Sequence, residues 1–366
     1  MTYRITTVVG ARPQFIKAAA VSRALCAHGG FHEDLIHTGQ HFDDNMSEVF
    51  FRELAIPPPR HHLDIHGGPH GQMTGRMLEA IERVVMTEPP DLVLVYGDTN
   101  STLAGALCSA KLHIPVAHVE AGLRSFNRRM PEEINRIMTD HVSALLLCPT
   151  LEAVSHLGRE GITEGVFHTG DVMFDATLFA REAAASRTDV LKTLGLTSGA
   201  YAVCTLHRSE NTDNADRLRQ LLAYVRSAAG DSTVVFPVHP RTRQVIASTG
   251  VSTEGMLLLE PSGYFDMHRL LSGSQIVLTD SGGLQKEAYF HRVPCVTLRD
   301  ETEWVETVRA GWNRLWQEPE YRLPRSGIVE YGTGQAAVMI ANLLYEFLTH
   351  GRVGNAPGLG LKSAEC

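Results

Sequence analysis

The segment TDSGGLQKEA, Thr279–Ala288, carries residue types that can hold a phosphate group. It follows an apolar run and leads into a helical pattern, so its Ser-Gly-Gly sequence stands where a strand would turn into a helix. Such a turn offers free backbone N–H groups and the positive end of the helix dipole, which suits a diphosphate. Glu287, one turn further on, can accept hydrogen bonds from vicinal hydroxyls such as those of a ribose. Taken alone, this motif fits an ordinary strand–helix turn with an exposed glutamate equally well.

Charged and imidazole side chains also follow the other apolar runs of the chain. They lie in the segments Gly10–Pro13, Gly39–His41, Gly97–Asn100, Glu120–Arg124, His207–Asn211, His239–Arg241 and Asp280–Gly283. Open parallel sheets bind ligands at the carboxyl ends of their strands, so these groups are expected at one edge of a sheet. Arg12 and Lys17, after the first run, can neutralise phosphate charge.

These segments require strands in front of them, and the apolar runs predict where the strands lie. In the first half they are Ile5–Val9, Leu35–Thr38, Leu92–Tyr96, Val116–Val119 and Ala144–Cys148, with helical patterns such as Gln14–Ala27, Met73–Met86 and Ser101–Lys111 between them. In the second half they are Ala202–Leu206, Val234–Pro237, Leu257–Leu259, Ile276–Thr279 and Cys295–Leu298. Near-continuous apolar strands separated by helices indicate parallel sheets covered on both faces.

Two such series predict an α/β protein of two doubly wound, Rossmann-like domains that face each other across a cleft. We expect residues 1–170 in the first domain, 171–345 in the second, and a helix end with a loose tail at 346–366. The groups at the strand ends place the expected site between the domains, where two-domain α/β enzymes close on their ligands.

Composition narrows the class of function. The formal net charge of -8 and the pI near 6.1 argue against a nucleic-acid or anionic-membrane partner. No uninterrupted apolar run approaches the ~18 residues of a membrane span, and the N-terminus is too short and too polar for a signal peptide. The six cysteines are scattered without a C-x-x-C pair, which is typical of reduced thiols. We therefore expect a cytoplasmic protein.

A series of longer motifs identifies a family. They are GARPQFIKA at Gly10–Ala18, TGQHFD at Thr38–Asp43, VYGDTNST at Val95–Thr102, HVEAGLRS at His118–Ser125, MPEEINR at Met130–Arg136, LHRSEN at Leu206–Asn211, TDSGGLQKEA, and RDETEW at Arg299–Trp304. With these motifs in this order, the chain resembles the non-hydrolysing UDP-N-acetylglucosamine 2-epimerases from about Ile5 to Leu348. That family has a fold of the glycosyltransferase-B type.

The resemblance implies inversion of C2 in a UDP-linked 2-acetamido sugar, for surface polysaccharide precursors. No carbonyl carbon neighbours the C2 hydrogen, so this C–H group is not acidic enough for direct proton abstraction. Departure of UDP from C1 makes the proton labile. UDP leaves to give a glycal and then adds back. This route needs acid/base groups around C2 and cations for the diphosphate. It needs no NAD and no metal, because UDP itself is both leaving group and nucleophile.

The family's motifs place particular residues in these roles. The expected acid/base groups are Asp98, Glu120, Glu132 and His207. The expected substrate and UDP contacts are Arg12, Lys17, Arg208, Glu210, His239, Ser281, Gly282, Gly283 and Glu287. The resemblance also implies a homodimer, for which the helix with Met73, Met77 and Met86 is a candidate interface.

Each of these residues also has a purely structural interpretation. Asp98 before Thr-Asn-Ser is a fair helix cap, Glu120 can pair with Arg124 at the surface, and Glu132 stands in a first helical turn where acids are common. All of these would have to hold together at one edge of the fold. The functional alternatives are a UDP-sugar glycosyltransferase of the same fold and a catalytically silent sugar-nucleotide sensor.

Two other patterns carry less weight. Gly332–Ala337 matches G-x-G-x-x-A, but no later strand completes a dinucleotide-binding unit. The histidines of HHLDIHGGPH, which are His61, His62, His66 and His70, fit no usual zinc spacing and lie in a Pro/Gly-rich stretch that predicts a loop.

Finer motifs concern substrate and regulation. HFDDNMSEVFF, LDIHGGPHGQMTGRML and RSFNRRMPEEINR are most similar to family members that act on a UDP-linked 2,3-diacetamido-2,3-dideoxy-glucuronate. Gln14 stands where plain UDP-GlcNAc enzymes usually have Glu, which would remove a repulsion from a uronate, while Arg128 or Arg129 supplies a counter-charge. A regulatory UDP-GlcNAc site known in bacterial relatives maps to Gln40, His41 and Arg76, but Asp43 replaces its usual second glutamine.

Overall fold

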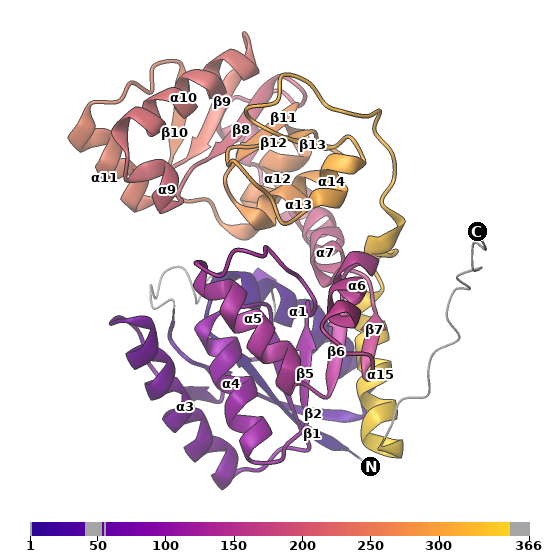
Figure 1. Ribbon diagram of the computed structural model, residues 1–366. Coiled ribbons are helices and arrows are strands. Elements are labelled where there is room, and N and C mark those ends of the chain that lie inside the picture. The colour runs from indigo at the N-terminus through magenta and orange to yellow at the C-terminus, as the bar shows by residue number, and fades with distance from the viewer. Residues whose placement is uncertain (1, 41–52, 55, 352–366) are drawn as a thin grey trace. The chain divides into compact units, whose positions relative to one another are not determined.

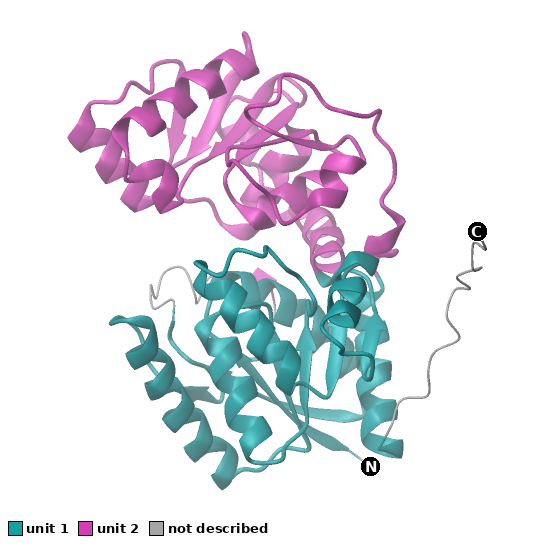
Figure 2. Ribbon diagram, viewed as in Figure 1, with its two compact units in different colours: residues 1–43, 56–172, 335–366 teal, residues 44–55, 173–334 magenta. Residues whose placement is uncertain are grey.

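The computed structural model describes residues 2–40, 53–54 and 56–351. The chain divides into two compact units (Figure 2): unit 1 comprises residues 1–43, 56–172 and 335–366, and unit 2 comprises residues 44–55 and 173–334. Each unit is built around its own sheet.

Unit 1 alternates strands and helices along the chain (Figure 1). Its strands are β1 Tyr3–Val9, β2 Phe31–His37, β3 His61–His62, β4 Leu92–Tyr96, β5 Val116–Val119, β6 Leu145–Cys148 and β7 Val166–His168. Its helices are α1 Arg12–His28, α3 His70–Thr87, α4 Asn100–Lys111, α5 Pro131–Val142, α6 Leu151–Arg159 and α15 Ala336–His350.

The described strands of unit 1 form one parallel sheet in the order β3-β2-β1-β4-β5-β6-β7. Every residue of β4 is buried, because helices cover both faces of the sheet. On one face, Val8, Val93 and Val95 pack with Met77 and Ile81 of α3. The predicted near-continuous apolar strands are therefore confirmed as the centre of a covered parallel sheet.

Unit 2 repeats the pattern with a second sheet. Its strands are β8 Tyr201–Thr205, β9 Thr233–Pro237, β10 Met256–Leu259, β11 Ile276–Thr279, β12 Cys295–Thr297 and β13 Asn313–Leu315. Its helices are α7 Val172–Arg187, α8 Val190–Thr193, α9 Ser209–Thr212, α10 Ala215–Ala229, α11 Pro240–Thr249, α12 Tyr264–Gly273, α13 Gly282–Phe290, α14 Val305–Arg309 and the 3₁₀ turn Val329–Tyr331.

The described strands of unit 2 are also parallel, in the order β10-β9-β8-β11-β12-β13. Successive residues of β8 belong to different cores: Ala202 packs in the cluster with Leu218 and Leu221 of α10, and Val203 in the cluster with Leu270 of α12. This period of two along a strand buried on both sides is the arrangement of a doubly wound fold. The predicted fold class is confirmed for both units.

The structure adds elements that the apolar runs did not indicate. β3, β7 and β13 each lie at the edge of a sheet and are only two or three residues long. An edge strand pairs on one side only and needs no continuous apolar run, so its sequence carries little signal. His61 and His62, predicted in a loop, form β3.

The last helix groups with unit 1. α15 packs against α1, and the ring of Tyr345 lies 5.7 Å from that of Tyr3 and 4.7 Å from that of His28, centroid to centroid. The expected second domain ran to residue 345, whereas the contacts place residues from 335 onward with the first unit. This return is invisible in the local sequence, because an amphipathic helix does not specify which sheet it covers.

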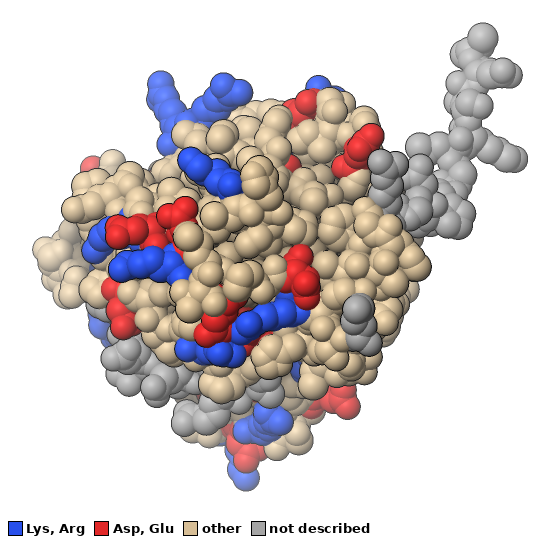
Figure 3. All heavy atoms as spheres, turned by 90° about the horizontal axis from the view of Figure 1, so that it is seen from below, with Lys and Arg blue, Asp and Glu red and all other residues tan. Residues whose placement is uncertain are grey.

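Charge is mixed on the face of the molecule drawn in Figure 3, where acidic and basic side chains are interspersed. In unit 1, for example, Arg4 and Arg60 both pair with Asp34 and Glu88. In the described part of the chain, none of the helices combines the length and the apolar character needed to cross a bilayer.

Candidate active site

The strand orders of both sheets define a switch point, at which the chain reverses its direction of winding. In unit 1 it lies between β1 and β4, and in unit 2 between β8 and β11. Ligands of doubly wound sheets bind beyond the carboxyl ends of the strands at such points. Gly10–Arg12 and Gly97–Asp98 follow the strands at the first, and Leu206–Arg208 and Asp280–Gly282 at the second.

A pocket of about 240 Å³ opens at the switch point of unit 1. Its lining residues are Ala11, Pro13, Gln14, Lys17, Gln40, His70, Tyr96, Gly97, Asp98, Thr99, Asn100, Pro131, Glu132 and Asn135. Lys17, Asp98 and Glu132, which motifs far apart in the sequence had indicated, therefore share one cavity.

Asp98 is one of the acids that line this pocket. Its carboxylate accepts a hydrogen bond of 2.5 Å from Nη2 of Arg136, a residue of α5 that is 6% exposed. Burial raises the pKa of the Asp98 carboxyl above its ordinary value, although the positive charges of Arg136 and Lys17 act in the opposite direction. A raised pKa suits a group that must exchange protons near neutral pH. Thr99, not Asp98, caps α4, so the helix-cap interpretation of Asp98 is wrong.

Glu120 forms an ion pair with Lys17 beneath the same turn. Both side chains are nearly buried, at 8% and 9% exposure, so this is no surface pair. Glu120 is not paired with Arg124 as one interpretation had it: Arg124 instead pairs with Asp140 and Glu160. Glu120 also has a φ of 71°, a conformation that non-glycine residues seldom adopt and that concentrates at functional sites.

Glu132 and Glu133 are neighbours in the first turn of α5 but have different environments. Glu132 is exposed and lines the pocket. Glu133 is 1% exposed and accepts hydrogen bonds from the backbone N–H groups of Ser125 and Phe126, each 2.9 Å. Glu133 thus fixes the loop before α5, and Glu132 is left to face the cavity.

Gln14 has a structural function that the sequence did not reveal. Its Oε1 accepts from the N–H groups of Gly10 (2.8 Å) and Ala11 (3.0 Å), and its Nε2 donates to the carbonyl of Tyr96 and to Thr102, each 2.9 Å. All four of its hydrogen-bonding positions are thus used inside unit 1. A glutamate could not donate to the Tyr96 carbonyl, so the amide is explained without any charge on the substrate.

The expected regulatory residues that the structure describes make contacts with different segments. Gln40 lines the pocket and accepts from the hydroxyl of Ser101 at 2.8 Å. Arg76 instead donates to the carbonyls of His66 (2.9 Å) and Gly67 (2.8 Å), which ties it to the segment before α3. His41 lies outside the described residues. A second sugar-nucleotide site therefore stays a prediction.

At the switch point of unit 2, His207 pairs with a fully buried carboxylate. Its Nδ1 lies 3.1 Å from Oδ1 of Asp280, and Asp280 also accepts from the N–H groups of His207 and Arg208 and from Nδ2 of Asn211. Burial alone would raise the pKa of Asp280, but the bonds from His207 and its other donors outweigh it and leave the pKa lowered. As a carboxylate, Asp280 holds the proton of His207 on Nδ1, so Nε2 is the nitrogen available to a ligand.

The Ser-Gly-Gly turn begins α13, as predicted. The Ser281 hydroxyl caps the helix by accepting from the N–H of Leu284. A Cβ at Gly282 would lie 2.4 Å from Oε1 of Glu303, so a larger residue there would have to displace that carboxylate. Glu287 is 5% exposed, which makes the alternative of an ordinary exposed glutamate wrong.

The remaining predicted contacts of unit 2 lie on the segments that follow β8 and β9. His239 caps α11 by accepting from the N–H of Arg241 at 3.3 Å, and its ring centroid lies 6.3 Å from that of His207. Glu210 is exposed, with a carboxylate oxygen 3.6 Å from Nε of the buried Arg299. Arg208 precedes α9, and its charge contributes to lowering the pKa of Glu303.

The partners of the predicted acids were not identified from the sequence. They are Arg136 for Asp98, Asp280 for His207, and Asn135, which donates to the Asp98 carbonyl at 2.9 Å. Arg136 and Asp280 both stand inside the motifs already recognised, which was the available signal. Over residues 2–40, 53–54 and 56–351, no group of three or more His, Cys, Asp or Glu side chains has the arrangement to hold a metal ion.

Two doubly wound units in one chain, each with polar side chains gathered at its switch point, define an α/β protein of the glycosyltransferase-B type. The family model for UDP-N-acetylglucosamine 2-epimerase matches residues 23–344, and the chain belongs to this family of isomerases. The resemblance predicted from the motifs is thus confirmed.

Named relatives cover almost the whole chain. A Pseudomonas aeruginosa protein named UDP-2,3-diacetamido-2,3-dideoxy-D-glucuronate 2-epimerase is 50% identical over 357 residues, which span 93% of this chain and 99% of the relative. A UDP-N-acetylglucosamine 2-epimerase of Methanocaldococcus jannaschii is 43% identical, over 85% of this chain and 88% of that protein.

Solved structures agree on the fold. The Methanocaldococcus jannaschii UDP-GlcNAc 2-epimerase in complex with UDP-GlcNAc and UDP superposes with a TM-score of 0.85 at 40% identity, covering 93% of this chain and 99% of that one. The Neisseria meningitidis enzyme bound to UDP-GlcNAc gives a TM-score of 0.84 at 29% identity, covering 94% and 100%.

The contact between Arg136 and Asp98 generates a pH-dependent prediction. Arg136→Met removes a positive charge that lowers the pKa of Asp98, so that pKa must rise further. If turnover needs the Asp98 carboxylate, activity is then lost at a higher pH than in the wild type. We expect the acidic limb of the pH profile of kcat/KM to move to higher pH.

Arg136→Lys is the matched control, because it keeps the charge and loses only the fork geometry. It should move the acidic limb less than Arg136→Met does. An acidic limb at the same pH in the wild type and Arg136→Met would show that Asp98 does not set it.

Proposed function

We propose that this protein inverts C2 of a UDP-linked 2-acetamido sugar by eliminating UDP and adding it back. In the first step a base takes the C2 proton, the C1–O bond breaks with its electron pair leaving on UDP, and a C1=C2 double bond forms. In the second step a β-phosphate oxygen of UDP attacks C1, and C2 receives a proton on the opposite face. Neither step oxidises or reduces the sugar, so the proposal requires no redox cofactor, and it assigns no step to a metal.

One observation carries this proposal, namely the acidic pocket of unit 1. Asp98, Glu132 and Lys17 line it from different elements, and Glu120 is paired with Lys17. Proton transfer on two faces of one carbon needs at least two carboxyl groups that approach from different directions. A turn after β4 and the first turn of α5 supply such groups.

The proposed roles follow from these environments. Asp98, with its raised pKa, and the exposed Glu132 are the candidates for moving protons at C2. Glu120 holds Lys17 in place, so that the ammonium can face the departing phosphate. Which carboxylate serves which face stays open in this proposal.

A second set of groups is proposed to hold UDP. The N-terminus of α13, with Ser281, Gly282 and Gly283, suits the diphosphate, and Glu287 suits the ribose hydroxyls. His207, oriented by Asp280, is proposed as an acid that meets charge developing on the leaving group. Arg12 and Arg208 add positive charge, while Glu210 and His239 are proposed to complete the nucleotide contacts.

Heavy water separates this proposal from its alternatives. With UDP-GlcNAc or its diacetamido-uronate relative, and no acceptor, the wild-type protein should release nucleotide sugar that carries deuterium at C2. A glycosyltransferase or a silent sensor would leave C2 unlabelled, and that result with both substrates would refute the proposal.

The amide variants Asp98→Asn, Glu120→Gln and Glu132→Gln extend this test. Each removes a carboxyl group with little change in volume, so turnover should fall by ~10²-fold or more while UDP still binds. Glu133→Gln is a useful comparison, because it changes the neighbouring carboxylate, which holds a loop. Near-normal turnover in all three pocket variants would refute their assignment.

For the substrate, we propose a UDP-2,3-diacetamido-2,3-dideoxy-glucuronate. The 50% identity to the Pseudomonas aeruginosa protein of that name supports this, as do the motifs around residues 41–51 and 124–136. Gln14 no longer does, because its amide is used inside unit 1. The counter-charge for a uronate is proposed to come from Arg128 or Arg129, both exposed on the loop that Glu133 holds.

Side-by-side kinetics decide the substrate. We expect a higher kcat/KM for the diacetamido-uronate than for UDP-GlcNAc, and we expect Arg128→Ala or Arg129→Ala to reduce that preference by weakening only the charged substrate. Arg159→Ala, an exposed arginine on α6, is the control. A comparable or better kcat/KM for UDP-GlcNAc would refute the substrate proposal and indicate a UDP-GlcNAc 2-epimerase.

We also propose a cytoplasmic homodimer that supplies polysaccharide precursors, on the family resemblance alone. Of the three methionines expected at an interface on α3, Met77 is fully buried in the core of unit 1, so it cannot take part. Met86 is 65% exposed and stays a candidate.

A further inference from the structure

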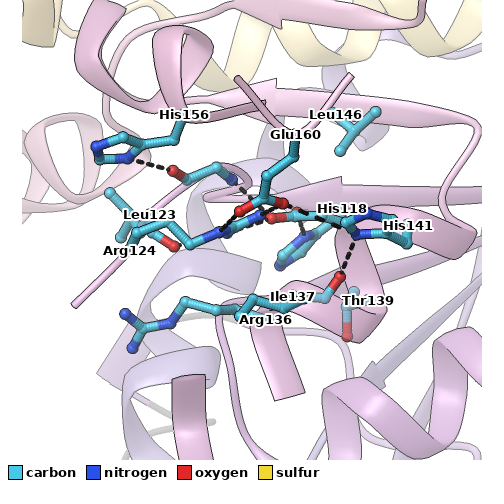
Figure 4. A network of polar contacts seen from close by, with 12 residues as sticks. His118, Leu123, Arg124, Arg136, Ile137, Thr139, His141, Leu146, His156 and Glu160 are labelled. Atoms are coloured by element: carbon cyan, nitrogen blue, oxygen red, sulfur yellow. Dashed lines mark hydrogen bonds and ion pairs between the residues drawn. The ribbon is translucent and has the colours of Figure 1, made fainter. Parts of the chain in front are cut away.

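A buried histidine lies directly behind the acidic pocket. His118, on β5, is 0% exposed, with Nδ1 2.7 Å from Oδ1 of Asp140 and Nε2 2.7 Å from the carbonyl oxygen of Gly97. Figure 4 shows His118 beside Arg124 and Glu160 within one network of polar contacts. No part of the mechanism described so far uses this side chain.

Both partners of His118 can only accept hydrogen bonds. The Gly97 oxygen is a carbonyl, and burial, which would raise the pKa of Asp140, is outweighed by the charges of His118 and Arg124, which leave that pKa lowered. The other carboxylate oxygen of Asp140 accepts from the N–H of Gly122 (3.1 Å) and from Nη1 of Arg124 (2.7 Å). Nε2 of His118 therefore donates to the Gly97 carbonyl, while Nδ1 faces the Asp140 carboxylate.

Each contact of this pair holds a segment that bears a pocket carboxylate. The Gly97 carbonyl belongs to the peptide group that leads into Asp98. Gly122, bound by Asp140, lies two residues after Glu120 on the turn that follows β5. Asp140 itself is on α5, the helix whose first turn carries Glu132.

We propose that His118 and Asp140 form a positioning pair that sets the mutual placement of Asp98, Glu120 and Glu132. This inference rests on the proposed function, because it assigns the pair a role in bringing those carboxylates to one carbon. Neither side chain lines the pocket, so the pair acts through the segments it joins and not on the substrate.

The energetics favour a role in geometry over one in stability. Burying an ion pair costs desolvation energy that its attraction often only offsets, and apolar side chains could fill the same space. Here the ion pair is backed by Arg124, which also makes two hydrogen bonds of 2.7 and 2.8 Å to the carboxylate of Glu160. The result is a chain of directional contacts that fixes Asp140, and hence α5, against the turn after β5.

Two substitutions at His118 separate its two contacts. The amide nitrogen of Asn takes the place of Nδ1, so His118→Asn can keep the bond to Asp140 but loses the Gly97 carbonyl. The longer His118→Gln places its nitrogen near Nε2 and can keep the Gly97 bond instead. We expect kcat to fall ~10- to 100-fold in His118→Asn, with KM changed far less, because small displacements of reacting groups have effects of this order. His118→Gln should lose less.

Glu88→Gln is the matched control. It removes an ion-pair partner of Arg4 and Arg60 in unit 1, away from the pocket, and should lower the melting temperature with kcat unchanged. Asp140→Asn is the second variant if His118→Asn does not fold, and it too should lower kcat more than KM. Unchanged kcat in the folded variants, or an equal loss in Glu88→Gln, would overturn the positioning role.

A readout that does not depend on turnover keeps this test distinct from that of the proposed function. Backbone amides of residues 97–103 should exchange with heavy water faster in His118→Asn than in the wild type, and at the wild-type rate in Glu88→Gln. Unaltered exchange in His118→Asn would refute the pair's hold on the turn. Deuterium at C2 in the wild type tests the proposed function separately.

Discussion

Gly97 is the residue on which the pocket of unit 1 depends. Its N–H donates to the carbonyl of Val119 at 3.0 Å, and its carbonyl accepts from His118 at 2.7 Å, so β5 holds both of its backbone polar groups. Its φ is 63°, and a Cβ there would lie 3.2 Å from Nζ of Lys17 and 3.3 Å from Oε2 of Glu120. Only glycine both adopts this turn and leaves room for the ion pair beneath it. The position of Asp98 follows from that constraint.

Around Gly97, two carboxylates are each paired with a cation. Asp98 meets Arg136, and Glu120 meets Lys17. Because burial disfavours the ionised form of Asp98 while the two cations favour it, its proton affinity is set by a balance and not by a single contact. Unit 2 uses the same principle with a different outcome, since the donors around Asp280 leave its pKa lowered and fix the tautomer of His207.

Much of this was available from the sequence, for identifiable reasons. Strands such as Leu92–Tyr96 and Ile276–Thr279 are buried on both faces, so their apolar runs gave their bounds directly. The pocket acids and Lys17 follow strands or begin helices, where position alone predicts a shared edge. The partners Arg136 and Asp280 lie 38 and 73 residues from Asp98 and His207, and local patterns do not specify which distant groups pair. The hydrogen bonds of Gln14 were missed for the same reason, since all four of its partners are backbone atoms or belong to another element of the fold.

The prediction that groups of both units act on one UDP-sugar stays a prediction, and the chemistry proposed for that sugar can be tested on the intact protein. The most direct measurement is positional isotope exchange, with ¹⁸O in the oxygen that bridges C1 and the β-phosphorus. If the C1–O bond breaks while UDP is retained, the label must appear in the non-bridging β-phosphate oxygens of recovered substrate and product. Epimerisation in which all of the label stays in the bridge would contradict the elimination and re-addition of UDP.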